Sequence, residues 1–179
     1  MNENLTYEFV VDERPEGSRK LKKILGRGSM LVAIAVFVIF FTVLNPALAP
    51  LAVFPLAMLG VVLYVWKFFN VELEYSMTSG YISFTRIYGG QKRKAVLKML
   101  CIKDMQAIAP VTDTTMAELS ARGVEKSYMF ASHSSAEDMY YAIFEKDGVK
   151  CVVYFEATQK ALHNLRYYNT STVVTNVSR

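Results

Sequence analysis

The residues of this chain that could carry out chemistry are few and lie far apart in the sequence. His133 and His163 are its two histidines, and neither has a partner at the spacing of a metal-binding motif. His133 lies in a serine-rich stretch and His163 in a stretch with helical periodicity, so both are expected to be solvated. Asp104 is the best isolated carboxylate, but Lys103-Asp104-Met105 is typical of a turn. The sequence therefore predicts no catalytic residues and no metal ligands.

Two further features resemble binding motifs without meeting their requirements. Gly89-Gly90 lacks the downstream lysine and serine or threonine of a phosphate-binding loop. Cys101 and Cys151 are isolated and flanked by apolar residues, which is typical of reduced cysteines in a strand or core. We expect no cofactor. An enzyme with an unrecognised site is the least favoured of the three functions considered.

The side chains with a functional pattern are basic. Lys92-Arg93-Lys94, with Arg86 nearby, could contact anionic lipid headgroups or could protect a sheet edge from mispairing. An earlier basic run could contact headgroups or could simply set a membrane topology. The predicted contact residues for lipid or a partner are therefore Arg19, Lys20, Lys22, Lys23, Arg86, Lys92, Arg93 and Lys94.

The overall charge argues against nucleic-acid binding. The chain has a net charge of +4, but from Val71 onward 13 Lys+Arg stand against 11 Asp+Glu, which leaves +2. A nucleic-acid-binding domain should instead carry a strongly basic stripe. We expect no nucleic-acid partner.

Apolar residues are concentrated in one stretch, from Gly28 to Phe69, which contains a single charged residue, Lys67. Met30–Leu44 and Leu51–Phe69 are separated by Asn45 and two prolines, a pattern typical of two apolar helices and a short loop. A buried hairpin of a water-soluble protein would need a polar face, which the first run lacks. The sequence therefore predicts two transmembrane helices, integral in the lipid bilayer.

The charges that flank this stretch predict its orientation. Basic residues precede the first apolar run and follow the second, whereas the loop between the runs has no charge. The positive-inside rule then places both termini in the cytoplasm. We expect a multi-pass protein of the plasma membrane.

The rest of the chain alternates like half-buried strands. Asp147-Gly148 predicts a type I′ hairpin, Thr158 can cap a final amphipathic helix, and Met116–Arg122 could make one or two helical turns. Pro110 is expected at a sheet edge. The seven predicted antiparallel strands are Val71–Thr78, Tyr81–Tyr88, Arg93–Met99, Gln106–Val111, Lys126–Ser132, Asp138–Glu145 and Val149–Glu156.

This order resembles a pleckstrin-homology-like (PH-like) barrel. The chain is similar to small membrane proteins of Clostridia-type Gram-positive bacteria that carry two helices followed by a PH-like domain. The similarity covers most of residues 20–168 and is carried by Glu74-Tyr75-Ser76-Met77-Thr78-x-Gly80, Arg86-Ile87-Tyr88-Gly89-Gly90-x-Lys92-Arg93-Lys94, Ile102-x-Asp104-Met105-x-x-Ile108-Ala109-Pro110 and Val153-Tyr154-Phe155-Glu156-Ala157-x-x-Lys160-Ala161-Leu162. The short uncharged turn Thr78-Ser79-Gly80 departs from the basic loop with which eukaryotic PH domains bind phosphoinositides.

These observations predict an α+β protein in which a transmembrane helical hairpin precedes a PH-like antiparallel β barrel of about seven strands, capped by a C-terminal helix. The expected parts are a basic segment at 1–28, the hairpin at 29–69, the β domain at 70–168 and a flexible tail at 169–179. Tyr7–Val11 could be a short strand or a helix beside the domain. The expected function is a membrane-anchored, non-catalytic interaction or scaffold module with an unknown protein partner. The alternative is an anionic-lipid-sensing or envelope-stress protein that uses Lys92-Arg93-Lys94.

Overall fold

The computed structural model describes residues 6–14, 17–44, 47, 50–51, 53–67, 70–134, 136 and 138–173. The chain divides into two compact units, which we describe separately. The β unit comprises Met1–Glu13, Glu72–Ile87 and Arg93–Arg179, and the helical unit comprises Arg14–Val71 and Tyr88–Lys92.

The first sheet of the β unit is a four-stranded meander in the order β1-β2-β3-β4. Its strands are β1 (Tyr7–Asp12), β2 (Val71–Thr78), β3 (Tyr81–Tyr88) and β4 (Lys92–Cys101). The predicted limits of β2 and β3 are confirmed. Between them, Ser79 and Gly80 have φ values of 52° and 86°. A Cβ at Gly80 would also lie 3.1 Å from the Tyr168 ring, so this turn requires glycine.

Strand β1 settles what Tyr7–Val11 forms. It pairs antiparallel with β2, from Tyr7 opposite Met77 to Asp12 opposite Glu72. The helices lie between these two strands in the sequence. The segment from Glu13 to Asn70 is therefore, in topology, one very long hairpin connection.

The second sheet has the order β5-β7-β8-β6. Its strands are β5 (Ala107–Pro110), β6 (Lys126–Phe130), β7 (Met139–Lys146) and β8 (Val149–Glu156). Asp147 and Gly148 both have positive φ, which confirms the predicted type I′ turn between β7 and β8. Pro110 lies on an edge strand, as predicted.

The prediction of one antiparallel barrel of about seven strands is wrong. The described strands form two four-stranded sheets and no closed barrel, and β6 is parallel to β8. The chain leaves the edge strand β5, forms helix α3 (Thr115–Ala121) and returns as β6 at the opposite edge. Such a crossover gives parallel strands. Alternation within a strand identifies its buried face but not its neighbours, so the sequence pattern could not show this.

Aromatic side chains fill the space between the two sheets. Ring centroids lie 6.0 Å apart for Tyr75 and Phe155, 5.7 Å for Phe84 and Phe155, and 5.1 Å for Phe84 and Phe130. All four residues are fully buried. The Tyr75 hydroxyl donates a hydrogen bond to the Glu156 carbonyl, and burial raises the pKa of Tyr75 far above its usual value. Tyr75 is therefore a neutral donor at all physiological pH values.

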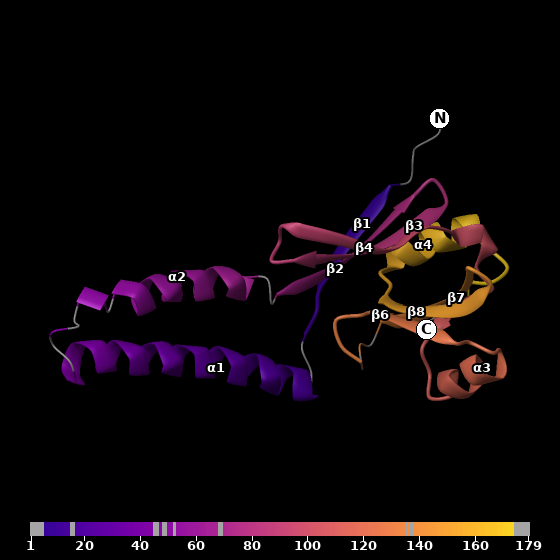
Figure 1. The fold of residues 1–179 in the computed structure, drawn as a ribbon. Helices are drawn as coiled ribbons and strands as arrows, with labels where there is room; N and C mark the ends of the chain where they lie inside the picture. Colours follow the sequence, from indigo (N-terminus) through magenta and orange to yellow (C-terminus); the bar gives the residue numbers. More distant parts are fainter. Residues whose placement is uncertain are drawn as a thin grey trace. The chain divides into compact units, whose positions relative to one another are not determined.

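Helix α4 (Gln159–Tyr168) buries Ala161, Leu162 and Leu165. The Thr158 side chain accepts a hydrogen bond from the Ala161 amide, which confirms the predicted N-cap. In Figure 1, α3 and α4 lie on opposite sides of the second sheet.

Packing continues beyond residue 168, where the tail was expected to start. The side-chain amide of Asn169 donates hydrogen bonds to the carbonyls of Ile102 and Met105, and Val173 forms an isolated parallel β-bridge with Ile108. Residues 174–179 of the expected tail lie outside the described residues.

The helical unit contains α1 (Gly17–Ile39), a π-helical turn η1 (Phe40–Leu44) and α2 (Val53–Lys67). Within the described ranges, none of the helices combines the length and the apolar character that crossing a membrane requires. Helix α1 is long but starts among basic residues, and its regular geometry ends at Ile39, while α2 has 15 residues where about 20 are needed. The predictions of a transmembrane hairpin and of a multi-pass plasma-membrane protein are therefore contradicted.

Removal of the Tyr75 hydroxyl should destabilise the β unit. We expect Tyr75→Phe to lower the free energy of unfolding by about 1–2 kcal/mol, because the partly buried Glu156 carbonyl loses this donor. Denaturant unfolding measures the change, and Tyr81→Phe, at an exposed position of the same sheet, is the matched control. Equal effects of the two substitutions would contradict the role of this hydrogen bond.

The β unit should fold when the long connection is removed. Joining Asp12 to Glu72 through Asn-Gly places a two-residue turn at an existing cross-strand pair. We expect a cooperative unfolding transition and dispersed amide NMR signals. Joining Asp12 to Leu73 instead loses the Asp12–Glu72 pair and closes Val11 and Leu73 with the three-residue loop Asp12-Asn-Gly, so this variant should fold less stably. If both variants are unfolded, the β unit depends on the helices.

Candidate interaction site

Two of the predicted basic contact residues have internal roles. Arg86 places its guanidinium 5.3 Å from the centroid of the Phe130 ring and donates to the Met129 carbonyl at 3.2 Å. Arg93 forms an ion pair at 3.5 Å with Glu74, whose side chain is only 8% exposed. These arginines therefore compensate a buried acid and cover a core aromatic ring. Lys92 and Lys94 are exposed on β4.

The N-terminal basic run lies on α1. Lys20 is exposed, and the Lys23 ammonium group donates to the Asn70 side chain at 3.3 Å. The side chains of Arg19 and Lys22 lie outside the described residues. This run belongs to the helical unit, together with Lys92, whereas Arg86, Arg93 and Lys94 belong to the β unit.

The isolated titratable residues of the sequence lie in different elements of the fold. The His133 Nδ1 atom lies 2.7 Å from the Ser132 hydroxyl, His163 is exposed on α4, and Asp104 lies in the short 3-10 turn η3 (Ile102–Asp104). Cys101 and Cys151 are free thiols, and burial raises the pKa of Cys151. No group of three histidine, cysteine, aspartate or glutamate residues in the described ranges could hold a metal ion.

A surface groove that the sequence did not predict lies beside α3. The helix packs on the outer face of the second sheet, where Leu119 contacts a cluster containing Tyr141, Ile143 and Val152. Because α3 does not cover β6, a pocket of about 490 Å³ is left between them. Its lining residues are Val111, Met116, Leu119, Ser120, Val124, Glu125, Lys126, Ser127, Met129, Ser134, Met139, Val152 and Tyr154.

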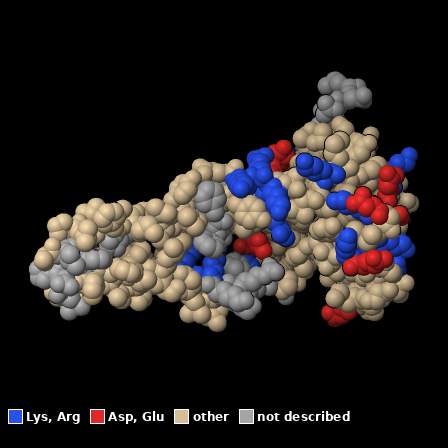
Figure 2. All heavy atoms as spheres, viewed as in Figure 1, with Lys and Arg blue, Asp and Glu red and all other residues tan. Residues whose placement is uncertain are grey.

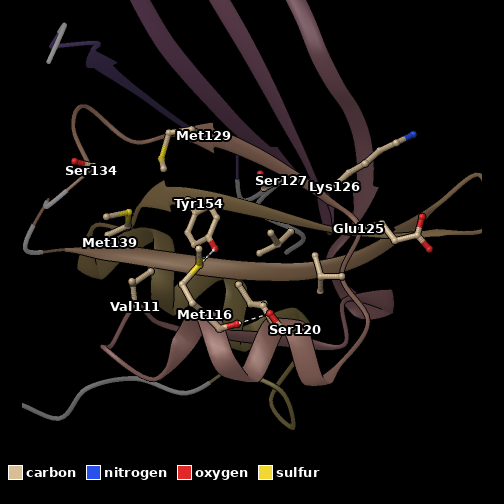
Figure 3. A pocket seen from close by; sticks show the side chains of 13 residues that line it. Val111, Met116, Ser120, Glu125, Lys126, Ser127, Met129, Ser134, Met139 and Tyr154 are labelled. Atoms are coloured by element: carbon tan, nitrogen blue, oxygen red, sulfur yellow. Dashed lines mark hydrogen bonds between the residues drawn. The ribbon is translucent and has the colours of Figure 1, made fainter. Parts of the chain in front are cut away.

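Most of the groove lining is apolar, and part of it is exposed. Met116 on α3 and Met129 on β6 are 73% and 43% exposed. Figure 3 shows Met129 on one side of Tyr154 and Met116 and Ser120 on the other, with Glu125 and Lys126 together at one end. The groove therefore presents apolar walls in its middle and a pair of opposite charges at one end.

Hydrogen bonds fix the two tyrosines under α3. The Tyr141 hydroxyl donates to the Glu118 carboxylate at 3.2 Å, and the Tyr154 hydroxyl donates to the Met116 sulfur at 3.8 Å. Burial, with the negative charge of Glu118, raises the pKa of Tyr141, and burial alone raises that of Tyr154. Both phenols are therefore protonated donors at neutral pH.

No spacing in the sequence marks this groove. Its lining comes from α3, three strands and the loops between them, and Met116 and Met129 are separated by twelve residues. The one indication in the sequence was Met116 in a short polar segment that was expected to be helical. A single apolar residue of this kind is common on protein surfaces and does not identify a groove.

The helical unit has a different surface. Large apolar side chains are exposed along both helices, among them Val32, Val36, Phe54 and Met58. On the face in Figure 2, most atoms of this unit are uncharged, whereas basic and acidic side chains are interspersed over the β unit. Extended apolar surface of this kind usually marks a site of interaction.

Comparison with known proteins supports the fold described above. Neither a curated protein nor a solved structure matches the chain. One family model, described as Bacterial PH-like domain (DUF6106), matches residues 3–175. The family description does not confirm the two membrane helices or the Clostridia-type origin that the sequence suggested. Since the matched range includes almost the whole chain, this protein belongs to the bacterial PH-like domain family DUF6106.

Proposed function

We propose that this protein is a non-catalytic interaction module whose PH-like domain binds an extended protein segment in the groove beside α3. The observation that carries the proposal is the exposure of Met116 and Met129 around a groove with an apolar floor. Concave apolar surface with a few polar groups is the usual form of a binding site. PH-like domains are generally non-catalytic, which agrees with this role.

The chemistry of the walls favours a protein segment over a rigid small molecule. Methionine has three rotatable side-chain bonds and a polarizable sulfur, so it adapts to side chains of different shapes. The hydroxyls of Ser120 and Ser127 lie among the apolar residues and can bond to a peptide backbone. The groove therefore offers apolar contacts with adaptable polar groups between them.

The position of β6 favours an extended conformation of the bound segment. Strand β6 is the outermost strand of the second sheet, on the side opposite β5. Ser127 and Met129 are two residues apart on it and both line the groove. A segment lying along β6 could direct every second side chain into the groove, as in strand addition, although the Met129 carbonyl already accepts from Arg86 and would not pair with the segment.

A charged side chain in the groove should abolish segment binding. We expect peptides selected from a random display library on the full-length protein to lose about tenfold or more in affinity for Met129→Arg, because a charged side chain would replace part of the apolar wall that the peptide contacts. Met99→Arg, at an exposed position on β4 outside the groove, is the matched control. Titration of each peptide by calorimetry or fluorescence anisotropy measures the effect.

Two results would contradict the proposal. One is selection of peptides that bind the wild type and Met129→Arg equally well. The other is repeated failure of the library to give any peptide with a Kd below about 1 mM, the affinity of a weak encounter.

The second candidate is contact with anionic lipid, and it depends on Lys92 and Lys94, which are exposed on one strand. We expect the double substitution Lys92→Glu, Lys94→Glu to weaken binding to vesicles of anionic lipid, measured relative to neutral vesicles, by at least about tenfold, since each basic residue contributes about 1 kcal/mol. The effect should shrink at high salt. Lys103→Glu with Lys146→Glu, also exposed, makes the same charge change and should have no such effect. Equal losses of vesicle binding in the two variants would show that binding depends on the net charge of the protein and not on Lys92 and Lys94.

A further inference from the structure

The most exposed of the large apolar side chains in the described part of the chain lies on the wall of the groove. It is Met116 on α3, which is 73% exposed and lines the groove together with Met129 and the buried Met139. A methionine sulfur that solvent can reach is open to small oxidants, which convert the thioether to a sulfoxide. The groove therefore presents an oxidisable group on its α3 side.

A tyrosine hydroxyl is already directed at this sulfur. The Tyr154 hydroxyl donates to the Met116 sulfur at 3.8 Å, drawn as a dashed line in Figure 3. Burial raises the pKa of Tyr154, so the phenol keeps its proton and remains a donor at neutral pH. A thioether sulfur is a weak acceptor, whereas a sulfoxide oxygen is a polar acceptor that forms a stronger hydrogen bond. Oxidation of Met116 would therefore strengthen the link between α3 and β8.

The modification is an oxygen transfer from a hydroperoxide such as hydrogen peroxide. A sulfur lone pair attacks the outer peroxide oxygen, so that an S–O bond forms while the O–O bond breaks. The sulfur loses two electrons and the peroxide gains them. The proton of the transferred hydroxyl passes to the released hydroxide, which leaves as water. Reduction by a methionine sulfoxide reductase restores the thioether.

A sulfoxide at Met116 changes the chemistry of the groove wall. The thioether is flexible and apolar, and it can adapt its shape to a bound side chain. The sulfoxide is polar, and a segment that covers it must remove water from its oxygen, which costs free energy unless the segment supplies a donor. In the oxidised groove, the Tyr154 hydroxyl would also hold the side chain against β8 and limit its adaptation.

We propose that Met116 is a site of reversible oxidation, and that its sulfoxide is held by the Tyr154 hydroxyl and weakens binding in the groove. The inference rests on the proposed binding of a protein segment, because it assigns a form of regulation to the same groove. The modification itself needs no partner chain, so its formation and its contact with Tyr154 can be measured without a bound segment.

The modification is tested on the full-length protein in a Cys101→Ser background, because the Cys101 thiol is partly exposed and would also consume peroxide. We expect dilute hydrogen peroxide to oxidise Met116 and Met99, which is 68% exposed outside the groove, before the buried Met139. Mass spectrometry of proteolytic fragments measures each conversion.

The contact with Tyr154 is measured by NMR on the same samples. We expect the ring signals of Tyr154 to shift as Met116 is oxidised and to return when a methionine sulfoxide reductase is added. In Met116→Leu, which keeps the apolar volume and removes the sulfur, the same treatment should leave these signals unchanged. Unmoved Tyr154 signals in a protein with fully oxidised Met116 would overturn the assigned contact.

Binding is tested with display-selected peptides that lack methionine and cysteine, added after the peroxide has been removed. We expect oxidation to weaken peptide binding about tenfold and the reductase to restore it. Met116→Leu should bind the peptides equally well before and after treatment. Met99→Leu and Met129→Leu are the matched controls, and both should lose affinity on oxidation as the wild type does.

The results separate this inference from the docking role. Equal peptide affinities of the reduced and the oxidised wild type, with Met116 fully converted, would overturn the regulation and keep the groove as a docking surface. A loss of affinity that persists in Met116→Leu would also overturn it, because the responsible sulfur would then lie elsewhere. Failure to select any peptide would instead reject the docking role, and the regulation with it.

Discussion

The contact between the two sheets is the constraint on which the rest of the β unit depends. Tyr75 and Phe84 come from the first sheet, Phe130 and Phe155 come from the second, and the centroid of each ring lies within about 6 Å of a ring from the other sheet. Each sheet exposes an apolar face that is stable only when the other covers it. The bond from the Tyr75 hydroxyl to the Glu156 carbonyl then fixes how the sheets meet at the start of α4.

The groove follows from the way in which the chain closes the second sheet. Strands β5 and β6 lie at opposite edges of the sheet, so the connection between them has to cross its outer face. Helix α3 makes this crossing but has only seven residues, and its apolar side chains cover β5, β7 and β8 rather than β6. Surface apolar residues are therefore left around β6 by topology, not by a local motif.

Two of the basic residues in the β unit contact groups within that unit. Arg86 and Arg93 look like parts of a basic surface in the sequence, but one covers Phe130 and the other pairs with the buried Glu74. A buried carboxylate needs a partner, and leaving it unpaired would be costly. A run of like charges in a sequence does not show which of its members are already paired in the fold.

The local elements of this protein follow from signals in its sequence, whereas the way in which they are joined depends on tertiary contacts. Alternation placed β2, β3 and β8, Asp147-Gly148 placed a hairpin, and Thr158 placed the start of α4, because each of these signals acts over a few neighbouring residues. Other features depend on contacts between residues that are distant in the sequence. They are the pairing of β1 with β2, the parallel pairing of β6 with β8, the extent of the helices around Gly28–Phe69 and the groove beside α3. Periodicity records which face of an element is apolar, but it does not record what covers that face.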